Sequence, residues 1–195
     1  MRNPLDKLHE RIEHQDAADR AVETHTVFVA GPYIEMDKDL EHPTNSETDS
    51  KRLRYGICDD FRAAGMGLYM GEDVALRLAG EKNFGVFNNA VAYERHYIKK
   101  YTDVIISLPC SPGSFCEVGD WITSHEICNK TLIIIDASFE GYFNYINDGV
   151  VKMARTQGAQ VKYLPYSDVP SILDVCRSFF EEIIAKKRMR ALYDE

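Results

Sequence analysis

Two short apolar runs constrain the fold of this chain more than any other feature. Residues 103–109 read DVIISLP and residues 130–137 read KTLIIIDA, and neither run alternates apolar with polar side chains. A strand with one face in water would alternate, whereas a strand of a parallel sheet is covered by helices on both faces and stays apolar throughout. The two runs therefore predict buried strands of a mainly parallel sheet.

The rest of the chain alternates strand and helix patterns around these runs. Further strands are predicted at residues 25–31, 67–73 and 159–165, and helices at residues 47–64, 83–100, 114–127, 142–157 and 168–189. Such alternation implies right-handed crossovers between parallel strands. We therefore expect an α/β fold, a Rossmann-like or flavodoxin-like doubly wound sandwich with a five-stranded, mainly parallel sheet. The acidic stretch of residues 33–50 is expected to be a long loop that acts as a lid or binds ligand.

The length of 195 residues fits one α/β domain over residues 25–195, preceded by an N-terminal helical extension over residues 1–24. No apolar run reaches the roughly 18 residues that span a bilayer, and the charged N-terminus lacks the apolar centre of a secretory signal. We expect no membrane partner and a cytoplasmic location. The amphipathic terminal helices favour a homo-oligomer, although the apolar stripe of the last helix fits the sheet of its own chain equally well.

Composition limits the partners. The formal net charge of −8 makes nucleic acid an unlikely main partner. The one basic cluster, at residues 185–190, ends a predicted helix, where cations complement the helix dipole. The five cysteines are scattered and complete no zinc-binding spacing, so we expect no metal and no cofactor.

Three polar segments follow predicted strands, at residues 30–35, 70–73 and 109–117. Ligands of doubly wound sheets bind outside the carboxyl ends of the strands, so these segments are expected to line one site. From them come Gly31, Pro32 and Tyr33 after the first strand, and Asp73 after the second. Gly31 permits a ligand to approach the backbone closely.

The third segment, CSPGSFCEVG at residues 110–119, allows two interpretations. Ser114 and Glu117 have the spacing of a capping box that starts a helix. The unpaired amides of such a helix start, here those of Gly113 and Ser114, also attract phosphate or carboxylate groups. Glu117 is then a structural cap, a reactive carboxylate beside a ligand, or both.

The segments FVAGP (28–32), AYERHYIKKYTD (92–103) and DVIISLPCSPGSFCEVG (103–119) together resemble the nucleoside 2-deoxyribosyltransferase family. That family ends its first strand with Ala-Gly-Pro and carries its nucleophile in the pattern Asp-x-Gly-[Ser/Thr]-x-x-Glu-x-Gly. Gly113, Ser114, Glu117 and Gly119 match this pattern. Deoxyribosyltransferase-like effectors of bacterial anti-phage systems, including retron-associated ones, are similar in the same segment.

The resemblance implies that Glu117 attacks or stabilises the anomeric carbon of a nucleoside sugar, with Glu94 as a second carboxylate. Gly31 and Pro32 would border the base or sugar. The loop after them departs from the family pattern, and it has few aromatic residues besides Tyr33 to stack on a base. Ser111 stands where the family has a sugar-binding Asp, which favours hydrolysis or altered transfer over strict deoxyribose transfer. In the family a neighbouring subunit helps to complete the site.

The sequence thus predicts an N-glycosidase or glycosyltransferase that acts on a nucleoside, nucleotide or NAD-like substrate. Two alternatives stay open. One is a nucleotide phosphoribohydrolase, whose Pro-Gly-Gly-x-Gly-Thr-x-x-Glu motif is matched in part by SPGSFCE (111–117). The other is a non-catalytic nucleotide-sensing module of a larger assembly, in which Glu117 serves only as a helix cap.

Overall fold

A computed structural model describes residues 24–193 of the chain, and the predicted N-terminal helix lies outside these residues. Five parallel strands form one sheet in the order β2-β1-β3-β4-β5. The strands are β1 (Thr26–Ala30), β2 (Gly67–Tyr69), β3 (Val104–Ser107), β4 (Thr131–Asp136) and β5 (Gln160–Leu164). This order is that of flavodoxin-like doubly wound sheets, and it confirms the predicted fold class.

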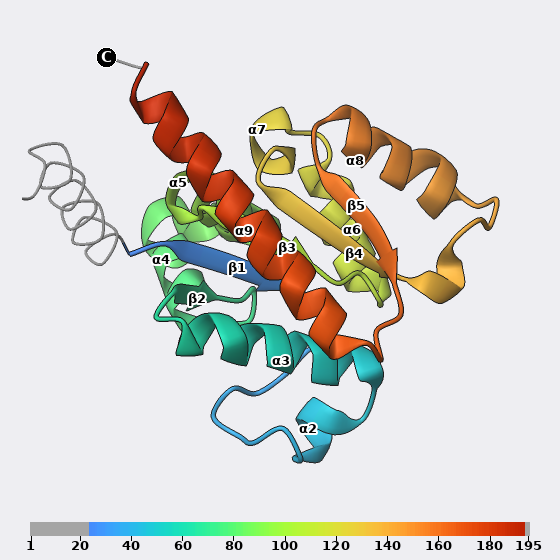
Figure 1. The fold of residues 1–195 in the computed structure, drawn as a ribbon. Helices are drawn as coiled ribbons and strands as arrows, with labels where there is room; N and C mark the ends of the chain where they lie inside the picture. Colours follow the sequence, from blue (N-terminus) through green and yellow to red (C-terminus); the bar gives the residue numbers. More distant parts are fainter. Residues whose placement is uncertain (1–23, 194–195) are drawn as a thin grey trace, which may run out of the picture.

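Helices cover both faces of the sheet (Figure 1). The helical elements are α2 (Pro43–Ser46), α3 (Asp49–Ala63), α4 (Val74–Phe84), the 3₁₀ turn η1 (Gly85–Phe87), α5 (Ala90–Tyr101), α6 (Pro112–Trp121), α7 (His125–Cys128), the 3₁₀ turn η2 (Ala137–Phe139), the π-helical turn η3 (Ile146–Val151), α8 (Lys152–Thr156) and α9 (Val169–Ala191). Helices α3 and α9 pack on one face and share an apolar core with it. The other face packs against α4 to α8 through a second core.

The two apolar runs are buried as predicted. Every residue of β3 and the first five residues of β4 are buried, because helices lie above and below both strands. Helix α9 buries its apolar stripe, which includes Ile172, Cys176 and Phe179, against its own sheet. That stripe therefore needs no second subunit to cover it, and homo-oligomerisation stays a prediction. No helix among the described residues is long and apolar enough to cross a bilayer.

Helix α4 was missed by the sequence prediction, which left residues 74–82 unassigned. Gly80 lies within it, and glycine weakens a helix pattern by about 1 kcal/mol relative to alanine. The structure explains the glycine, because a Cβ at position 80 would lie 2.5 Å from the Tyr93 Cβ and 2.4 Å from the Asn88 Oδ1. Close packing of α4 on α5 thus requires a residue that is unfavourable for an isolated helix.

The predicted loop at residues 33–50 is more ordered than expected, since it contains the short helix α2. It folds around Asn45, whose side chain is completely buried. The Asn45 amide nitrogen donates to the carbonyl oxygens of Glu35 (2.9 Å), Asp39 (2.8 Å) and Lys38 (3.3 Å), and its oxygen accepts from the Glu35 N–H (2.9 Å). One side chain therefore satisfies backbone groups that have no secondary structure of their own.

Replacement of Asn45 tests this organisation. Asn45→Ala leaves buried backbone groups unpaired and should lower the free energy of unfolding by about 1–3 kcal/mol in urea titrations. Asn45→Asp keeps the shape but cannot donate, so we expect a comparable loss. Thr44→Ala, a neighbouring change without these bonds, is the control. Equal effects of Asn45→Ala and Thr44→Ala would contradict the role of Asn45.

Candidate active site

The candidate site lies at the carboxyl ends of β1 and β3, where the direction of strand order reverses. Ala30 and Ser107, the last residues of these strands, are register partners. Doubly wound sheets bind their ligands at this switch point, because the loops that leave the two strands diverge to opposite faces. The segments of the chain that follow β1, β2 and β3 meet there.

Two adjacent cavities occupy this edge of the sheet. The first has a volume of about 220 Å³ and is lined by Phe28, Ala30, Gly31, Tyr33, Arg54, Gly71, Glu72, Glu94 and Glu117. The second has a volume of about 240 Å³ and is lined by Ala90, Val91, Glu94, Gly113, Cys116, Glu117, Asp120 and Trp121. Glu94 and Glu117 line both. Together the cavities reach the size of a small-ligand site.

Glu94 comes from the inward face of α5, where it shares the buried stripe with Ile98 four residues later. Its side chain is close to Gly71, because a Cβ at that position would lie 2.6 Å from the Glu94 Oε1. Burial, followed by the nearby charges of Glu117 and Glu72, raises the pKa of Glu94 from its usual 4.5 to about 7. Protonation of Glu94 is therefore favoured up to near neutral pH, where a free glutamate is ionised.

Glu117 lies in the second turn of α6, between the buried residues Ser114 and Val118. Burial raises the pKa of Glu117, while the positive charge of Arg54 lowers it. Glu94 also feels Arg54, but the charge of Glu117 acts on it more strongly and in the opposite direction. Both pKa values are raised, and the opposing effect of Arg54 ranks higher among the influences on Glu117 than among those on Glu94.

The start of α6 differs from the predicted capping box. Ser111, not Ser114, is the N-cap, and its hydroxyl accepts from the Ser114 N–H at 3.3 Å. The Ser114 hydroxyl accepts in return from the N–H groups of Ser111 and Cys110, both at 3.0 Å. The predicted Ser114–Glu117 box was therefore wrong by one turn, because Pro112 at the first helical position lets the helix begin earlier. Glu117 has no capping role.

Arg54 is the functional candidate that the sequence analysis missed. Its guanidinium is buried, at 1% exposure, and donates to the carbonyl oxygens of Val29 (2.7 Å) and Pro32 (2.7 Å). It also binds Glu72 through two hydrogen bonds of 2.7 and 3.0 Å. Arg54 thereby fixes the end of β1, the turn after it, and the segment after β2. The sequence held one signal that could have identified Arg54, because this arginine lies on the apolar stripe of α3 beside Ile57 and Cys58.

The other predicted residues occupy distinct places. Gly31 and Tyr33 line the first cavity, and Gly113 lines the second. A Cβ at Gly31 would lie 3.2 Å from both the Arg54 Cδ and the Leu108 Cβ, so glycine permits the close passage of this turn. Pro32 contributes its carbonyl oxygen to Arg54.

Four predicted residues line neither cavity: Pro32, Asp73, Ser111 and Ser114. The Asp73 carboxylate accepts from the Met70 N–H at 2.8 Å and so shapes the turn that presents Gly71 and Glu72. Within the described residues no cluster of three potential metal ligands is found, and all five cysteines are free thiols.

Residues 63–195 match the family of the STM3845 retron effector protein. The chain belongs to this retron effector family. The matched residues include Glu94 and Glu117, whereas Gly31 and Arg54 precede them. The predicted resemblance to effectors of anti-phage systems is thereby confirmed at the level of a retron effector.

A shorter segment is similar to a curated protein. It is 42% identical over 53 residues to a protein of Escherichia coli named retron Ec86 putative ribosyltransferase/DNA-binding protein. The segment spans 27% of this chain and only 17% of that relative. The name of the relative indicates a transferase, in agreement with the predicted class of chemistry.

The ion pair of Arg54 predicts a specific pattern of stabilities. Arg54→Met should lower the free energy of unfolding by about 3–5 kcal/mol, because it leaves Glu72 and two carbonyl oxygens unpaired. The double variant Arg54→Met/Glu72→Leu should lose at least about 1 kcal/mol less than the sum of the single variants. Arg52→Met, an exposed arginine of the same helix, is the control, with an expected change within about 0.5 kcal/mol. Additive losses in the cycle would contradict a coupled pair.

The raised pKa of Glu94 predicts how stability depends on pH. Between pH 4.5 and about 7 the folded protein holds a proton on Glu94 that the unfolded chain has released. A rise in pH through this window therefore weakens the folded state. Glu94→Gln removes this contribution, so the variant should gain stability relative to wild type as the pH rises from 4.5 to 8 in urea titrations. A constant stability difference between the two proteins across this range would contradict the assignment.

Proposed function

We propose that this chain cleaves or transfers at the N-glycosidic bond of a nucleoside, nucleotide or NAD-like substrate, with Glu117 as nucleophile or oxocarbenium stabiliser. The observation that carries the proposal is the pair Glu94 and Glu117, two half-buried to buried carboxyl groups that line the same cavities in different electrostatic surroundings. A pair of carboxyl groups, one acting as acid and the other as nucleophile or stabiliser, is the usual means by which a glycosidic bond is broken.

The two groups divide the reaction between them. Protonated Glu94 donates its proton to the departing base nitrogen as the bond from this nitrogen to the anomeric carbon breaks. The Glu117 carboxylate attacks the anomeric carbon, or balances the positive charge that develops there. Water or a second base then bonds to this carbon, Glu117 is released, and the proton of the incoming group returns to Glu94. The positive charge of Arg54 favours the ionised form of Glu117 that this role needs.

The remaining predicted residues fit the edges of such a site. Tyr33, whose side chain is exposed beside the first cavity, is in position to stack on a base. Gly113 lies in the first turn of α6, where backbone amides lack helical partners and attract a hydroxyl or phosphate group. In this proposal Ser111 and Ser114 act through the helix start that they form with one another, and Asp73 acts through the turn before α4.

The comparisons support this proposal at a coarse level. Membership of a retron effector family supports a defence-associated role, and the relative named a putative ribosyltransferase supports group transfer at a sugar. The deoxyribosyltransferase resemblance adds the substrate class. Ser111 in the place of the sugar-binding Asp favours a ribose-containing substrate or hydrolysis.

Replacement of the two carboxyl groups tests the proposal. Glu117→Gln should lower the rate of base release by at least about a thousandfold, and Glu94→Gln by about a hundredfold, while both variants still bind substrate. The assay is mass spectrometry of free bases after incubation with a mixed panel of nucleosides, nucleotides and NAD. Glu81→Gln, on the exposed side of α4, is the matched control and should leave the rate unchanged.

The outcome separates an enzyme from a binding module. If the wild-type chain binds members of the panel and releases no base from any of them, the enzymatic proposal is refuted in favour of a nucleotide-sensing module. Release that requires a 5′-phosphate would favour the phosphoribohydrolase alternative. If the variants melt close to the wild-type temperature, their loss of base release is not caused by unfolding.

A further inference from the structure

One ion pair of this chain joins the two helices that carry the candidate catalytic carboxyl groups. Arg95 directly follows Glu94 in α5. Asp120 lies three residues after Glu117 in α6, on the same side of that helix. The Arg95 guanidinium donates to the carboxylate (2.8 Å) and the carbonyl oxygen (3.1 Å) of Asp120, and to the Thr123 hydroxyl (3.2 Å). One side chain of α5 therefore binds the end of α6 at three points.

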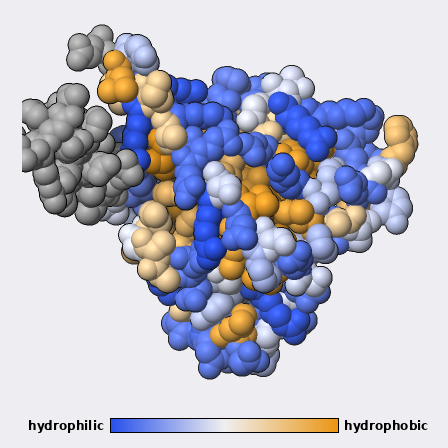
Figure 2. Space-filling view, viewed as in Figure 1, coloured by the Kyte–Doolittle hydropathy of each residue, from blue (hydrophilic) through white to orange (hydrophobic). Residues whose placement is uncertain are grey.

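This contact differs from most ion pairs on the surface. Many of those join residues one turn apart in a single helix, as Lys186 and Glu182 do on α9, and the surface over this helix is mostly hydrophilic (Figure 2). Such exposed pairs contribute little to stability. The side chains of Arg95 and Asp120 are each only 30% exposed, and they join two helices that β3 separates in the chain. A contact of this kind fixes the position of one helix relative to the other.

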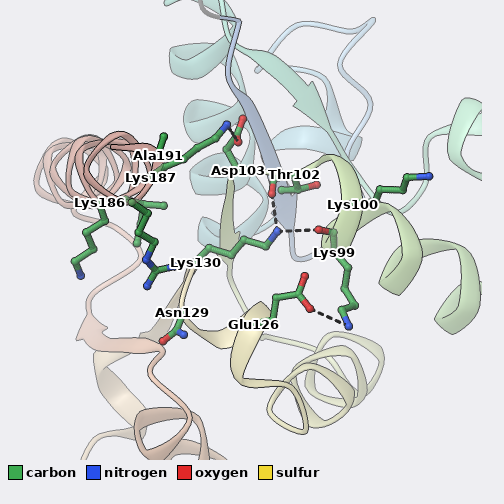
Figure 3. Close-up of a pocket in the computed structure, with 12 residues that line it drawn as sticks. Lys99, Lys100, Thr102, Asp103, Glu126, Asn129, Lys130, Lys186, Lys187 and Ala191 are labelled. Atoms are coloured by element: carbon green, nitrogen blue, oxygen red, sulfur yellow. Dashed lines mark hydrogen bonds and ion pairs between the residues drawn. The ribbon is translucent and has the colours of Figure 1, made fainter. Parts of the chain in front are cut away.

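The far end of α5 is fixed by other residues. Figure 3 shows Lys130, which precedes β4, beside Thr102 and Lys99 at this end of the helix. The Lys130 ammonium group donates to the Thr102 carbonyl oxygen at 2.6 Å. Lys99 also binds Glu126 of α7 at 2.9 Å. These contacts hold the carboxyl end of α5, whereas Glu94 lies in its first half.

Apolar packing alone does not set the distance between Glu94 and Glu117. The second cavity, of about 240 Å³, lies between the parts of α5 and α6 that carry these groups, and Asp120 lines it together with both. Among the described residues neither carboxyl group has a hydrogen-bonding partner, so each is placed by the helix that carries it. The spacing of the two helices beside this cavity therefore determines the spacing of the two carboxyl groups.

We propose that the contact between Arg95 and Asp120 positions the two carboxyl groups for catalysis, by holding α5 at a fixed distance from α6 beside the second cavity. The inference rests on the proposed function, in which Glu94 and Glu117 act on the two atoms of one glycosidic bond. A misplacement of about 1 Å between such groups can lower a rate by about a hundredfold. Arg95 lines neither cavity, so it is a positioning residue that acts through Glu94 and Glu117.

Replacement of Arg95 tests this role. Arg95→Met keeps the helix propensity of the position and removes all three hydrogen bonds. It should lower kcat for base release by at least about tenfold and leave KM within about twofold of wild type, because the spacing of the carboxyl groups matters in the transition state. Arg95→Lys keeps the charge but not the planar fork, so its kcat should lie between those of wild type and Arg95→Met. Rates are measured by mass spectrometry on the panel member that wild type cleaves fastest, at a temperature where circular dichroism shows every variant to be folded.

Two controls accompany these variants. Lys99→Met removes the contact of α5 with Glu126 of α7, one turn further along the helix, and should leave kcat within about twofold of wild type. The double variant Arg95→Met/Asp120→Asn also removes the negative charge that Arg95→Met leaves unpaired beside the cavity. Its kcat should stay as low as that of Arg95→Met, because the lost attachment between the helices is not restored.

Four outcomes would overturn the positioning role: an unchanged kcat in Arg95→Met, an equal loss in Lys99→Met, recovery of the wild-type kcat in the double variant, and a raised KM with unchanged kcat. The last result would assign Arg95 to substrate binding. All four require a wild-type protein that releases base. A failure of the proposed function is distinct from them, because wild type itself would then release no base and Arg95 would have no reaction to support.

Discussion

The buried guanidinium of Arg54 organises the active-site edge of this molecule. It binds backbone carbonyls of β1 and of the turn after it, and it pairs with Glu72 in the segment after β2. A buried cation is costly unless an opposite charge and hydrogen-bond acceptors lie close by, and here Glu72 and two carbonyl oxygens supply them. Its neighbours are therefore held in one arrangement, and this arrangement defines the walls of the first cavity. Loss of the cation would release the turn and leave Glu72 beside two other carboxyl groups.

The same cation makes a cluster of carboxyl groups possible. Glu72, Glu94 and Glu117 line one small cavity with a single positive charge among them. Glu72 forms two hydrogen bonds with Arg54. The positive charge of Arg54 opposes the rise in the pKa of Glu117, whereas burial and the neighbouring carboxylates raise the pKa of Glu94. Glu94 loses its proton as the pH rises, and the ionisation of this buried group weakens the fold. A group suited to acid catalysis is therefore kept at some expense of stability. Charge also differs between the two ends of the strands. Acidic side chains line the cavity at the carboxyl ends, and six basic side chains line a groove at the amino ends.

Local sequence patterns predicted the sheet and its edge well, because these depend on residues close in sequence. The uninterrupted apolar runs predicted that β3 and β4 are buried on both faces, and the polar segments after the strands indicated where the two cavities lie. Local patterns gave the wrong helix bounds where packing between distant segments determines the structure. Helix α4 carries Gly80 because α5 approaches it closely, and the first turn of α6 begins at Pro112, one turn earlier than the Ser114–Glu117 spacing implied. The local spacing left Glu117 open between a helix cap and a reactive carboxylate, and the family resemblance added a role for Glu117 and the second carboxylate Glu94.

By itself the sequence determined a parallel α/β sheet, the segments that meet at its carboxyl edge, and the candidate Glu117, since hydrophobic periodicity and motif spacing are properties of short stretches. Only the tertiary structure brought Arg54, Glu72 and Glu94 together around that residue, and only it assembled cations of α5, α9 and the segment before β4 into one groove. The physical reason is that charge and burial act through space. The state of a carboxyl group, or the combined field of several lysines, depends on distances that neighbours in sequence do not set.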